Sequence, residues 1–213
     1  MGGGEPGNRR DEERRGRVHR ALIELCFERG FAAVTAKELC GRAGVDREFF
    51  EREYGDLKAC FLRGFEVELQ RFHDRLDPIR NSDAPWRERV WRTGYELLRL
   101  FKEDEKATHF LVVEVRTAGE QALLLFGAEI NAMVDLIDEG RGVTAHPEEV
   151  TRATAEQITG GFFNHLYALF SQGDLPPEEE IIPQLMYTAV LPYLGEEAAV
   201  RELSAPPPPD PQR

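Results

Sequence analysis

Residues 35–50 read TAKELCGRAGVDREFF. A capping box opens this stretch, because the Thr35 hydroxyl can accept a free N–H of the helix while the Glu38 side chain reaches back. Gly44 predicts a tight turn after that short helix, and Asp46 is a good N-cap for the next one. Two short helices joined by a glycine-containing turn are typical of a helix-turn-helix.

The flanking residues extend this pattern to three helices. An apolar stripe predicts a first helix over about 14–29, which Gly30 ends in the usual C′ position. The third helix is expected over 47–53. In a helix-turn-helix the third helix protrudes, so that side chains of its first turn reach base edges in the major groove of duplex DNA.

The rest of the chain is also predicted to be helical. An apolar stripe with helical spacing runs through residues 57–76, and no segment shows the alternating pattern of a strand. The fold class is therefore all-α. Further helices are expected at about 86–103, 105–118, 120–139, 148–172 and 178–202, with Pro78 and Pro85 around a loop and Pro192 kinking the last helix.

Charge divides the 213 residues into two different parts. The chain has 39 acidic and 27 basic groups, a net charge of −12. Residues 1–60 contain twelve of each sign, so all of the negative excess lies after residue 60. A neutral N-terminal part permits contact with phosphates but does not demand it.

Several classes of protein are not indicated. We find no run of eighteen apolar residues and no apolar leader, so we expect a cytoplasmic protein without a membrane partner. The histidines lack metal-ligand spacing and no catalytic or cofactor motif is present, so we expect no metal, no cofactor and no enzyme activity. The three cysteines, Cys26, Cys40 and Cys60, lie in apolar patterns and are interpreted as packed side chains.

Residues 14–62 resemble the DNA-binding head of the TetR family of transcriptional regulators. The ordered landmarks are Phe27-Glu-Arg-Gly30-Phe31, Val34-Thr35, Leu39, Ala43-Gly44-Val45-Asp46, Tyr54 and Asp56-Leu-Lys-Ala-Cys-Phe-Leu62. The resemblance implies an N-terminal three-helix head followed by a C-terminal helical bundle for ligand binding and dimerisation. The expected division is a disordered arm over 1–13, a DNA-binding domain over 14–55, a ligand and dimerisation domain over 56–203 and a disordered proline-rich tail over 204–213.

The third helix departs from the family pattern. Residues 46–53 (DREFFERE) carry four acidic and two basic groups, so this helix is net negative. Phe49 and Glu51 stand where the family usually has a small residue or threonine and then a phosphate-binding tyrosine. Two functions therefore stay open: a ligand-responsive regulator, expected to be a repressor of palindromic operator DNA, or a dimeric interaction protein whose acidic head no longer binds DNA.

The predicted DNA-binding side chains each have a simpler structural alternative. Arg47 can contact guanine or pair with Glu51, and Glu48 can accept from cytosine or repel DNA. Phe49 is either exposed for a thymine methyl or packed on Tyr54. The full predicted set is Thr35, Lys37, Arg42, Arg47, Glu48, Phe49 and Lys58, and the cations Arg9, Arg10, Arg14, Arg15 and Arg17 could form an arm in the minor groove.

The last two expected helices carry the predicted dimer surface. The helix over 148–172 is apolar on most of its girth, which indicates burial on two sides. Gly160-Gly161 in its middle favours close approach of another helix. The predicted homodimer residues are Gly160, Gly161, Phe163, Tyr167, Phe170, Leu185, Met186 and Ala189.

Aromatic residues of the middle helices predict a cavity for a small hydrophobic or amphipathic effector. The alternative is a solid core. The resemblance implies that such an effector releases the DNA by moving the helix over 57–76. The predicted lining residues are Trp91, Tyr95, His109, Phe110, Phe126, Met133, Phe162 and His165.

Overall fold

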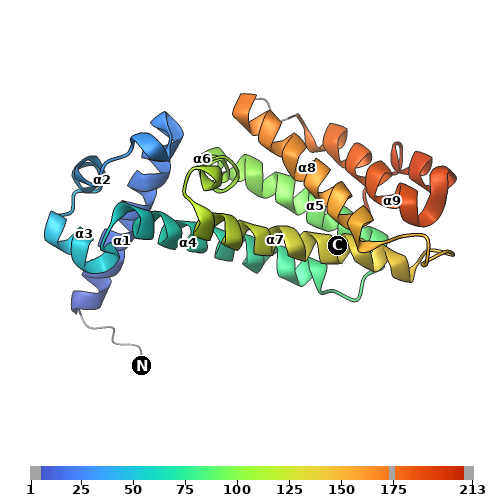
Figure 1. Ribbon diagram of the computed structural model, residues 1–213, viewed down its shortest axis with the longest axis horizontal. Coiled ribbons are helices and arrows are strands. Elements are labelled where there is room, and N and C mark those ends of the chain that lie inside the picture. Colours follow the sequence, from blue (N-terminus) through green and yellow to red (C-terminus); the bar gives the residue numbers. More distant parts are fainter. Residues whose placement is uncertain (1–5, 173–175, 209–213) are drawn as a thin grey trace. The chain divides into compact units, whose positions relative to one another are not determined.

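The computed structural model describes residues 6–172 and 176–208, and this part of the chain is all-α, as predicted. Figure 1 shows the helices in chain order. Their bounds are α1 (Pro6–Arg29), α2 (Ala36–Ala43), α3 (Arg47–Tyr54), α4 (Leu57–Arg80), α5 (Trp86–Glu103), α6 (Glu105–Val112), α7 (Glu120–Asp138), α8 (Arg152–Gln172) and α9 (Glu178–Glu202), with 3-10 turns η1 (Phe31–Ala33), η2 (Glu114–Arg116) and η3 (Glu139–Gly142).

The chain forms two compact units. The head unit comprises the chain up to Leu69 together with Glu105–Leu125, and the body unit comprises Gln70–Asp104 together with the chain from Phe126. The boundaries fall inside α4 and α7, so both helices run from one unit into the other. The head unit is therefore larger than the three helices expected over 14–55.

Apolar side chains explain why α6 belongs to the head unit. The buried stripe of α1 includes Val18 and Leu22, and α1 packs against both α2 and α6. The ring of Phe61 lies with its centroid 4.5 Å from that of Phe110 and 6.0 Å from that of Phe65. These three rings are fully buried and join the start of α4 to α6.

The first helix begins earlier than expected. Residues 6–13 belong to α1, so most of the predicted disordered arm is helical. Proline in the first turn favours this start, because its fixed φ suits a helix and its missing N–H would have no partner there. Residues 1–5 and 209–213 of the predicted arm and tail lie outside the described residues, and residues 205–208 have no regular secondary structure.

Two proline predictions were wrong. Pro78 lies inside α4, which continues to Arg80, because the buried Arg80 guanidinium donates to Glu129 Oε1 at 2.8 Å and holds the last turn in place. In α9 the helical backbone is interrupted at Gly195 (φ 80°, ψ 174°), three residues after Pro192. A glycine tolerates this positive φ, so the chain bends there. The predicted helices 105–118 and 148–172 are also shorter than expected, ending at Val112 and beginning at Arg152.

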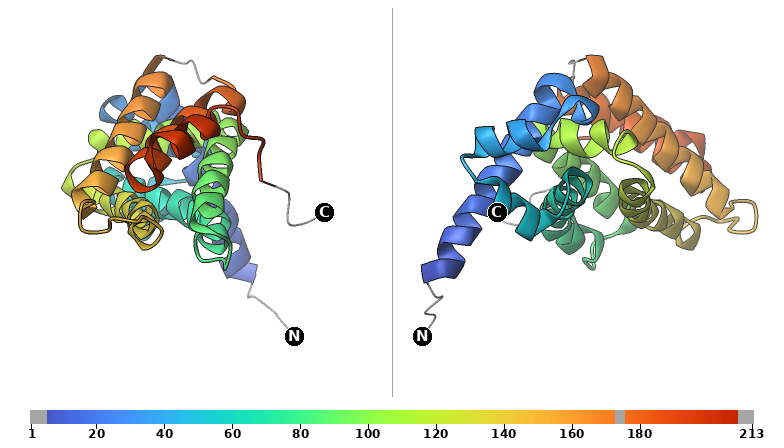
Figure 2. Two further views of the ribbon diagram at one scale, coloured as in Figure 1. Left: turned by 90° about the vertical axis from the view of Figure 1, so that its right-hand side faces the viewer. Right: turned by 60° about the vertical axis from the view of Figure 1, so that its left-hand side comes forward.

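The body unit packs α5 and α8 against α9, and Figure 2 shows α8 and α9, the orange and red helices, side by side. Trp86 anchors this unit by donating its Nε1–H to the carbonyl of Leu136 at 2.8 Å. Its ring meets Tyr193 edge-on at 5.2 Å, and a Cβ on Gly140 would lie within 2.8 Å of both rings. In residues 6–172 and 176–208, no helix combines the length and apolarity needed to cross a bilayer.

Candidate nucleic-acid interface and ligand pocket

The helix-turn-helix forms as its caps predict. The amide N–H of Glu38 donates to Thr35 Oγ1 at 3.3 Å, and the amide of Thr35 donates to Glu38 Oε2 at 3.2 Å. Gly44 adopts the left-handed conformation at φ 63° between α2 and α3, a backbone that a side chain would strain. The amide N–H of Phe49 donates to Asp46 Oδ1 at 2.7 Å, which lowers the pKa of that carboxyl group.

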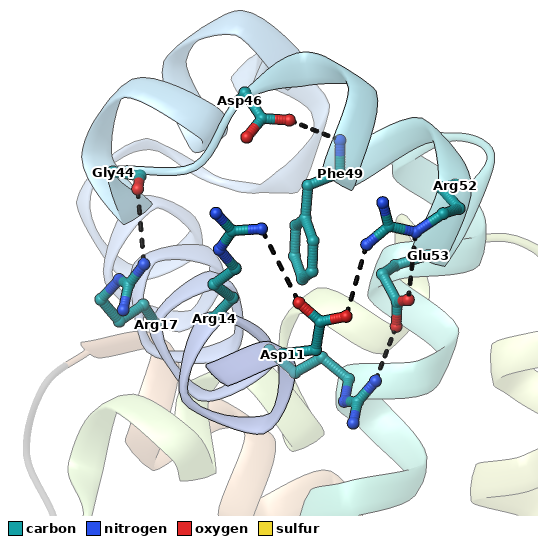
Figure 3. Close-up of polar contacts among 9 residues, drawn as sticks. Asp11, Arg14, Arg17, Gly44, Asp46, Phe49, Arg52 and Glu53 are labelled. Carbon is teal, nitrogen blue, oxygen red and sulfur yellow. Dashed lines mark hydrogen bonds and ion pairs between the residues drawn. The ribbon is translucent and has the colours of Figure 1, made fainter. Parts of the chain in front are cut away.

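Phe49 is not available to DNA, so that prediction was wrong. Its side chain is only 1% exposed. Figure 3 shows its ring between two guanidinium groups, whose carbons lie 5.1 Å (Arg14) and 5.3 Å (Arg52) from the ring centroid. Asp11 pairs with both arginines, at 3.7 and 3.5 Å. Tyr54 packs instead on the neighbouring ring, Phe50, at 5.4 Å.

Contacts between α1 and α3 accompany this burial. Residues 6–13 add helical turns that bring Asp11 beside α3, so the face of α3 that carries Phe49 meets α1. We call Asp11, Arg14, Phe49 and Arg52 the α1–α3 clasp. Cations stacked on an aromatic face and a shared carboxylate hold the two helices together.

The arginines of the predicted arm are mostly engaged within the head unit. Arg15 Nη1 lies 2.9 Å from Glu53 Oε2, and Arg17 Nε donates to the carbonyl of Ala43 at 2.9 Å. Figure 3 shows a second contact of Arg17, which donates from Nη2 to the carbonyl of Gly44 at 3.4 Å. These contacts fix α1 to α2 and α3, which a mobile arm in the minor groove would not allow. Arg9 and Arg10 are exposed.

The other predicted DNA-binding residues are exposed on the head unit. Arg42 forms a two-pronged ion pair with Glu28, at 2.8 and 2.9 Å, which raises the pKa of the arginine and lowers that of the glutamate. Arg47 Nε donates to Glu51 Oε1 at 2.6 Å, the simpler alternative weighed from the sequence. The exposed residues are Thr35, Lys37, Arg42, Arg47, Glu48 and Lys58.

These exposed pairs leave the surface chemically competent to bind phosphate. Exposed ion pairs contribute little stability, because water solvates each ion almost as well as its partner does. A phosphate oxygen can therefore replace Glu28 at Arg42, and a guanine edge can replace Glu51 at Arg47. The carboxylates then remain close to the nucleic acid and oppose its approach.

Glu114 is a further head-unit residue that no sequence pattern singled out. This carboxylate is 5% exposed and accepts the amide N–H of Phe31 at 2.7 Å. It thereby links η2 to the turn that leads into α2. The two residues are 83 positions apart, so no local pattern could have indicated the contact.

In the body unit, three predicted ligand residues line adjoining hollows. Met133 and Phe162 line a small pocket with a volume of about 40 Å³. Phe162 and His165 line an open groove of about 370 Å³ along α8 and α9. Trp91 and Tyr95 line neither hollow and stack on each other with centroids 5.1 Å apart. The ring of Phe126 packs edge-on against Phe163 at 5.8 Å.

His109 and Phe110 were wrongly predicted to line this pocket. Both lie on α6 and therefore in the head unit. Phe110 is fully buried against Phe61, and the His109 ring meets that of Phe27 edge-on at 5.3 Å. Aromatic composition alone did not reveal that α6 packs on α1.

The predicted dimer residues separate into two groups. Gly160 and Gly161 are exposed, and Phe163, Tyr167 and Phe170 on the same helix are half-buried. Met186 and Ala189 are 1% and 0% exposed, so their side chains are used inside the protomer and cannot contact a second copy. Leu185 lines both hollows of the body unit.

The cysteines are buried and unreactive. Burial raises the pKa of Cys60 to about 12 and raises that of Cys26 further. A thiol with so high a pKa carries almost no thiolate near neutral pH, so neither residue fits a redox sensor.

No protein-family model and no curated protein matches the sequence. Solved structures do. A TetR family transcription regulator from Marinobacter aquaeolei VT8 is 18% identical with a TM-score of 0.64, covering 85% of this chain and 96% of that one. The chain has the fold of the TetR regulators.

Two further structures with the TetR fold are similar over most of their length. A gamma-butyrolactone receptor, described as an ArpA-like protein, has a TM-score of 0.70 at 13% identity. The match covers 92% of this chain and 95% of that one. The regulator FadR from Bacillus subtilis, solved with stearoyl-CoA, has a TM-score of 0.67 at 14% identity. The match covers 84% of this chain and 97% of that one. The helix-turn-helix described above occupies the N-terminal position that the TetR fold gives it.

Proposed function

We propose that this chain is a ligand-responsive transcriptional regulator, a repressor that binds palindromic operator DNA as a homodimer. One observation carries the proposal: α3 follows α2 through the left-handed Gly44 and exposes its first turn, where 68% of the Arg47 side chain is accessible. A short helix with a free, exposed first turn has the shape that enters a major groove.

The proposed contacts divide into two kinds. Arg47 and Glu48 stand at the start of α3 and are proposed to read base edges. Thr35, Lys37, Arg42 and Lys58 are proposed to contact phosphates, which position the head without reading sequence. Phe49 is no longer part of this set, because it is buried in the α1–α3 clasp.

The proposed dimer uses the exposed face of α8. Gly160 and Gly161 offer close helix approach, and Phe163, Tyr167 and Phe170 leave part of their rings accessible on that helix. A two-fold axis through this face repeats the same contacts on both chains. Two copies of α3 then read two half-sites of a palindrome.

The proposed effector is a small hydrophobic or amphipathic molecule bound by the body unit. Its small pocket is lined almost entirely by apolar atoms, and the adjoining groove is large enough for a chain of carbon atoms. The B. subtilis FadR structure contains stearoyl-CoA, an acyl ligand of that protein. Thermodynamic linkage requires that DNA and effector weaken each other's binding if the effector releases DNA.

A dimeric interaction protein is the second candidate function. The observation that favours it is that the cations Arg42 and Arg47 already have carboxylate partners, on a helix-turn-helix whose third helix is net negative. Such a head would present a mixed-charge surface to a protein instead of a basic surface to DNA.

Selection of bound sequences from random duplexes at low salt separates the two candidates. The regulator predicts an enriched palindrome whose affinity falls steeply with salt. Replacing Arg47 with alanine should then cost about tenfold in affinity at one base pair of each half-site and relax preference there. Arg201→Ala is a matched control, because Arg201 pairs with Glu197 one helical turn away at 2.7 Å in α9. Absence of any enriched sequence from a dimeric, folded protein would favour the interaction protein.

A further inference from the structure

Two threonines with buried hydroxyl groups line the small pocket of the body unit. Thr93 on α5 is 2% exposed and Thr159 on α8 is 4% exposed, and both line the pocket of about 40 Å³. Neither hydroxyl has a hydrogen-bond partner among the described residues. The other ten lining residues are Gly94 and apolar side chains of α5, α7, α8 and α9.

Threonine in a helix usually avoids this situation. Its hydroxyl donates to the carbonyl one turn earlier, as Thr188 does to Gln184 at 2.9 Å in α9. A buried hydroxyl without a partner is costly, because it loses its hydrogen bonds to water and gains none. Thr93 and Thr159 both carry this free-energy cost, and both line the same pocket. This indicates that a bound group supplies the missing hydrogen bond.

The lining also limits the charge of that group. No ionisable side chain lines the small pocket. A carboxylate or an ammonium placed there would lose its hydration without gaining a counter-ion. A neutral oxygen, by contrast, can accept a hydrogen bond from either threonine while its carbon neighbours contact the apolar walls.

The rest of such a ligand can occupy the adjoining groove. Ile158, Phe162 and Leu185 line both the small pocket and the open groove of about 370 Å³, so the two hollows adjoin. The side chains of Phe162 and Leu185 form the wall between them. An elongated molecule that displaces this wall can keep its oxygen beside the threonines and extend its carbon chain along α8 and α9.

We propose that the body unit binds a neutral, largely apolar molecule with a hydrogen-bonding oxygen, a ketone, alcohol or ester, held by Thr93 and Thr159. This assignment deepens the function proposed above and rests on it for the name effector. It distinguishes the ligand from fatty acids and other anions, which lack a partner for their charge in the small pocket. In the proposed homodimer, the second copy would lie next to the open groove.

Calorimetric titration of the full chain without DNA tests the proposal. The probes are octan-2-one, octane and octanoate, which share a chain length and differ in the oxygen. We expect octan-2-one to bind, octane to bind more weakly and octanoate not to bind at pH 8. Thr93→Val and Thr159→Val keep the side-chain volume and remove the oxygen, so each should weaken octan-2-one by about fivefold and leave octane unchanged.

Thr154→Val is the matched control, since Thr154 lies on α8 and lines neither hollow. Thermal unfolding without a probe gives the second measurement. Removing an unpartnered hydroxyl should leave the melting temperature of both pocket variants unchanged or raised. Equal octan-2-one affinity in the wild-type chain and both variants would overturn the proposal, as would stronger binding of octanoate.

The two proposals fail separately in these experiments. Binding of octan-2-one without any selected DNA sequence would contradict the regulator and keep the ligand class. A selected palindrome with no binding of octan-2-one would contradict the ligand class and keep the regulator.

Discussion

The head unit and the body unit treat their polar groups in opposite ways. In the head unit, Arg42 and Arg47 are exposed and each already has a carboxylate partner. In the body unit, Thr93 and Thr159 are buried and have no partner among the described residues. Exchanging a solvated ion pair for a contact with phosphate costs little free energy. A buried hydroxyl without a hydrogen-bond partner, by contrast, is stabilised by any neutral oxygen that reaches it.

This difference indicates how each surface would select its ligand. The paired surface of the head unit would bind with an affinity set by salt and by competition from Glu28 and Glu51. The pocket would select by charge and shape, because its lining has no ionisable side chain that could pair with a charged ligand. The following changes test the two sides of the comparison, beginning with the largest expected effect.

The largest effect on stability is expected at Phe49, the buried ring of the α1–α3 clasp. Phe49→Ala removes the ring that fills the α1–α3 clasp and should lower the free energy of unfolding by about 3–5 kcal/mol. Urea denaturation measures this loss. Glu48→Ala, one residue earlier and exposed, should change the stability by less than about 0.5 kcal/mol. Equal stability of the two variants would mean that the clasp does not hold α3.

Alkaline pH should destabilise the head unit through a buried neutral acid. Burial raises the pKa of Cys60 from 9.0 to about 12, so the neutral thiol stabilises the fold fully below pH 9 and loses that contribution as pH rises towards 12. Within this window the unfolded thiol ionises first, and stability should fall by about 1.4 kcal/mol per pH unit. Denaturation at pH 8 and pH 10 measures the slope. Cys60→Ala should show a smaller slope, and an unchanged slope would contradict the assignment.

The capping box gives a smaller effect in the same unit. Thr35→Ala removes the hydroxyl that accepts the Glu38 amide and should lower the free energy of unfolding by about 1 kcal/mol. Lys37→Ala changes an exposed side chain two residues later and is the control. Circular dichroism followed during urea denaturation checks both variants. A Thr35 variant as stable as the control would show that the cap is dispensable.

The smallest effect on stability should accompany a gain in DNA binding. Glu28→Gln removes the nearer of the two carboxylate partners of the exposed Arg42 and leaves Glu24 at 3.5 Å, so the melting temperature should hardly change. In the proposed regulator, the released arginine should strengthen DNA binding and steepen its salt dependence by about one unit of log slope. Filter binding at several salt concentrations measures the slope. An unchanged slope would place Arg42 away from the phosphates.

Local patterns predicted the head unit well up to the positions of its caps. Thr35, Gly44 and Asp46 act within a few residues of themselves, so their chemistry is visible in the sequence. The role of Phe49 was not visible, because it depends on contacts with Arg14 and Asp11 that are distant in the chain, and Asp11 lies in a turn of α1 that carries no apolar pattern. Residues 6–13 were predicted to be disordered because they are polar. A proline in the first helical turn and long-range ion pairs favour a helix there instead.

The pocket shows the same limit more strongly. Met133 and Phe162 were predicted to line it, and Phe110 was placed there on the same aromatic argument. Only packing distinguishes them, since α6 lies against α1 in the head unit and α7 and α8 lie in the body unit. Thr93 and Thr159 had no signal at all, because an unpartnered hydroxyl is defined by what surrounds it.

The sequence by itself determined the all-α class, the helix-turn-helix and the excess of negative charge after residue 60. These properties follow from periodicity, capping and composition, which act over one or two helical turns. Tertiary structure alone decided that Phe49 is enclosed, that Met186 and Ala189 face inward and that two threonines meet at one pocket. Each of those facts requires helices distant in the chain to come together. The free energy of that packing depends on several segments at once, so no single segment determines it.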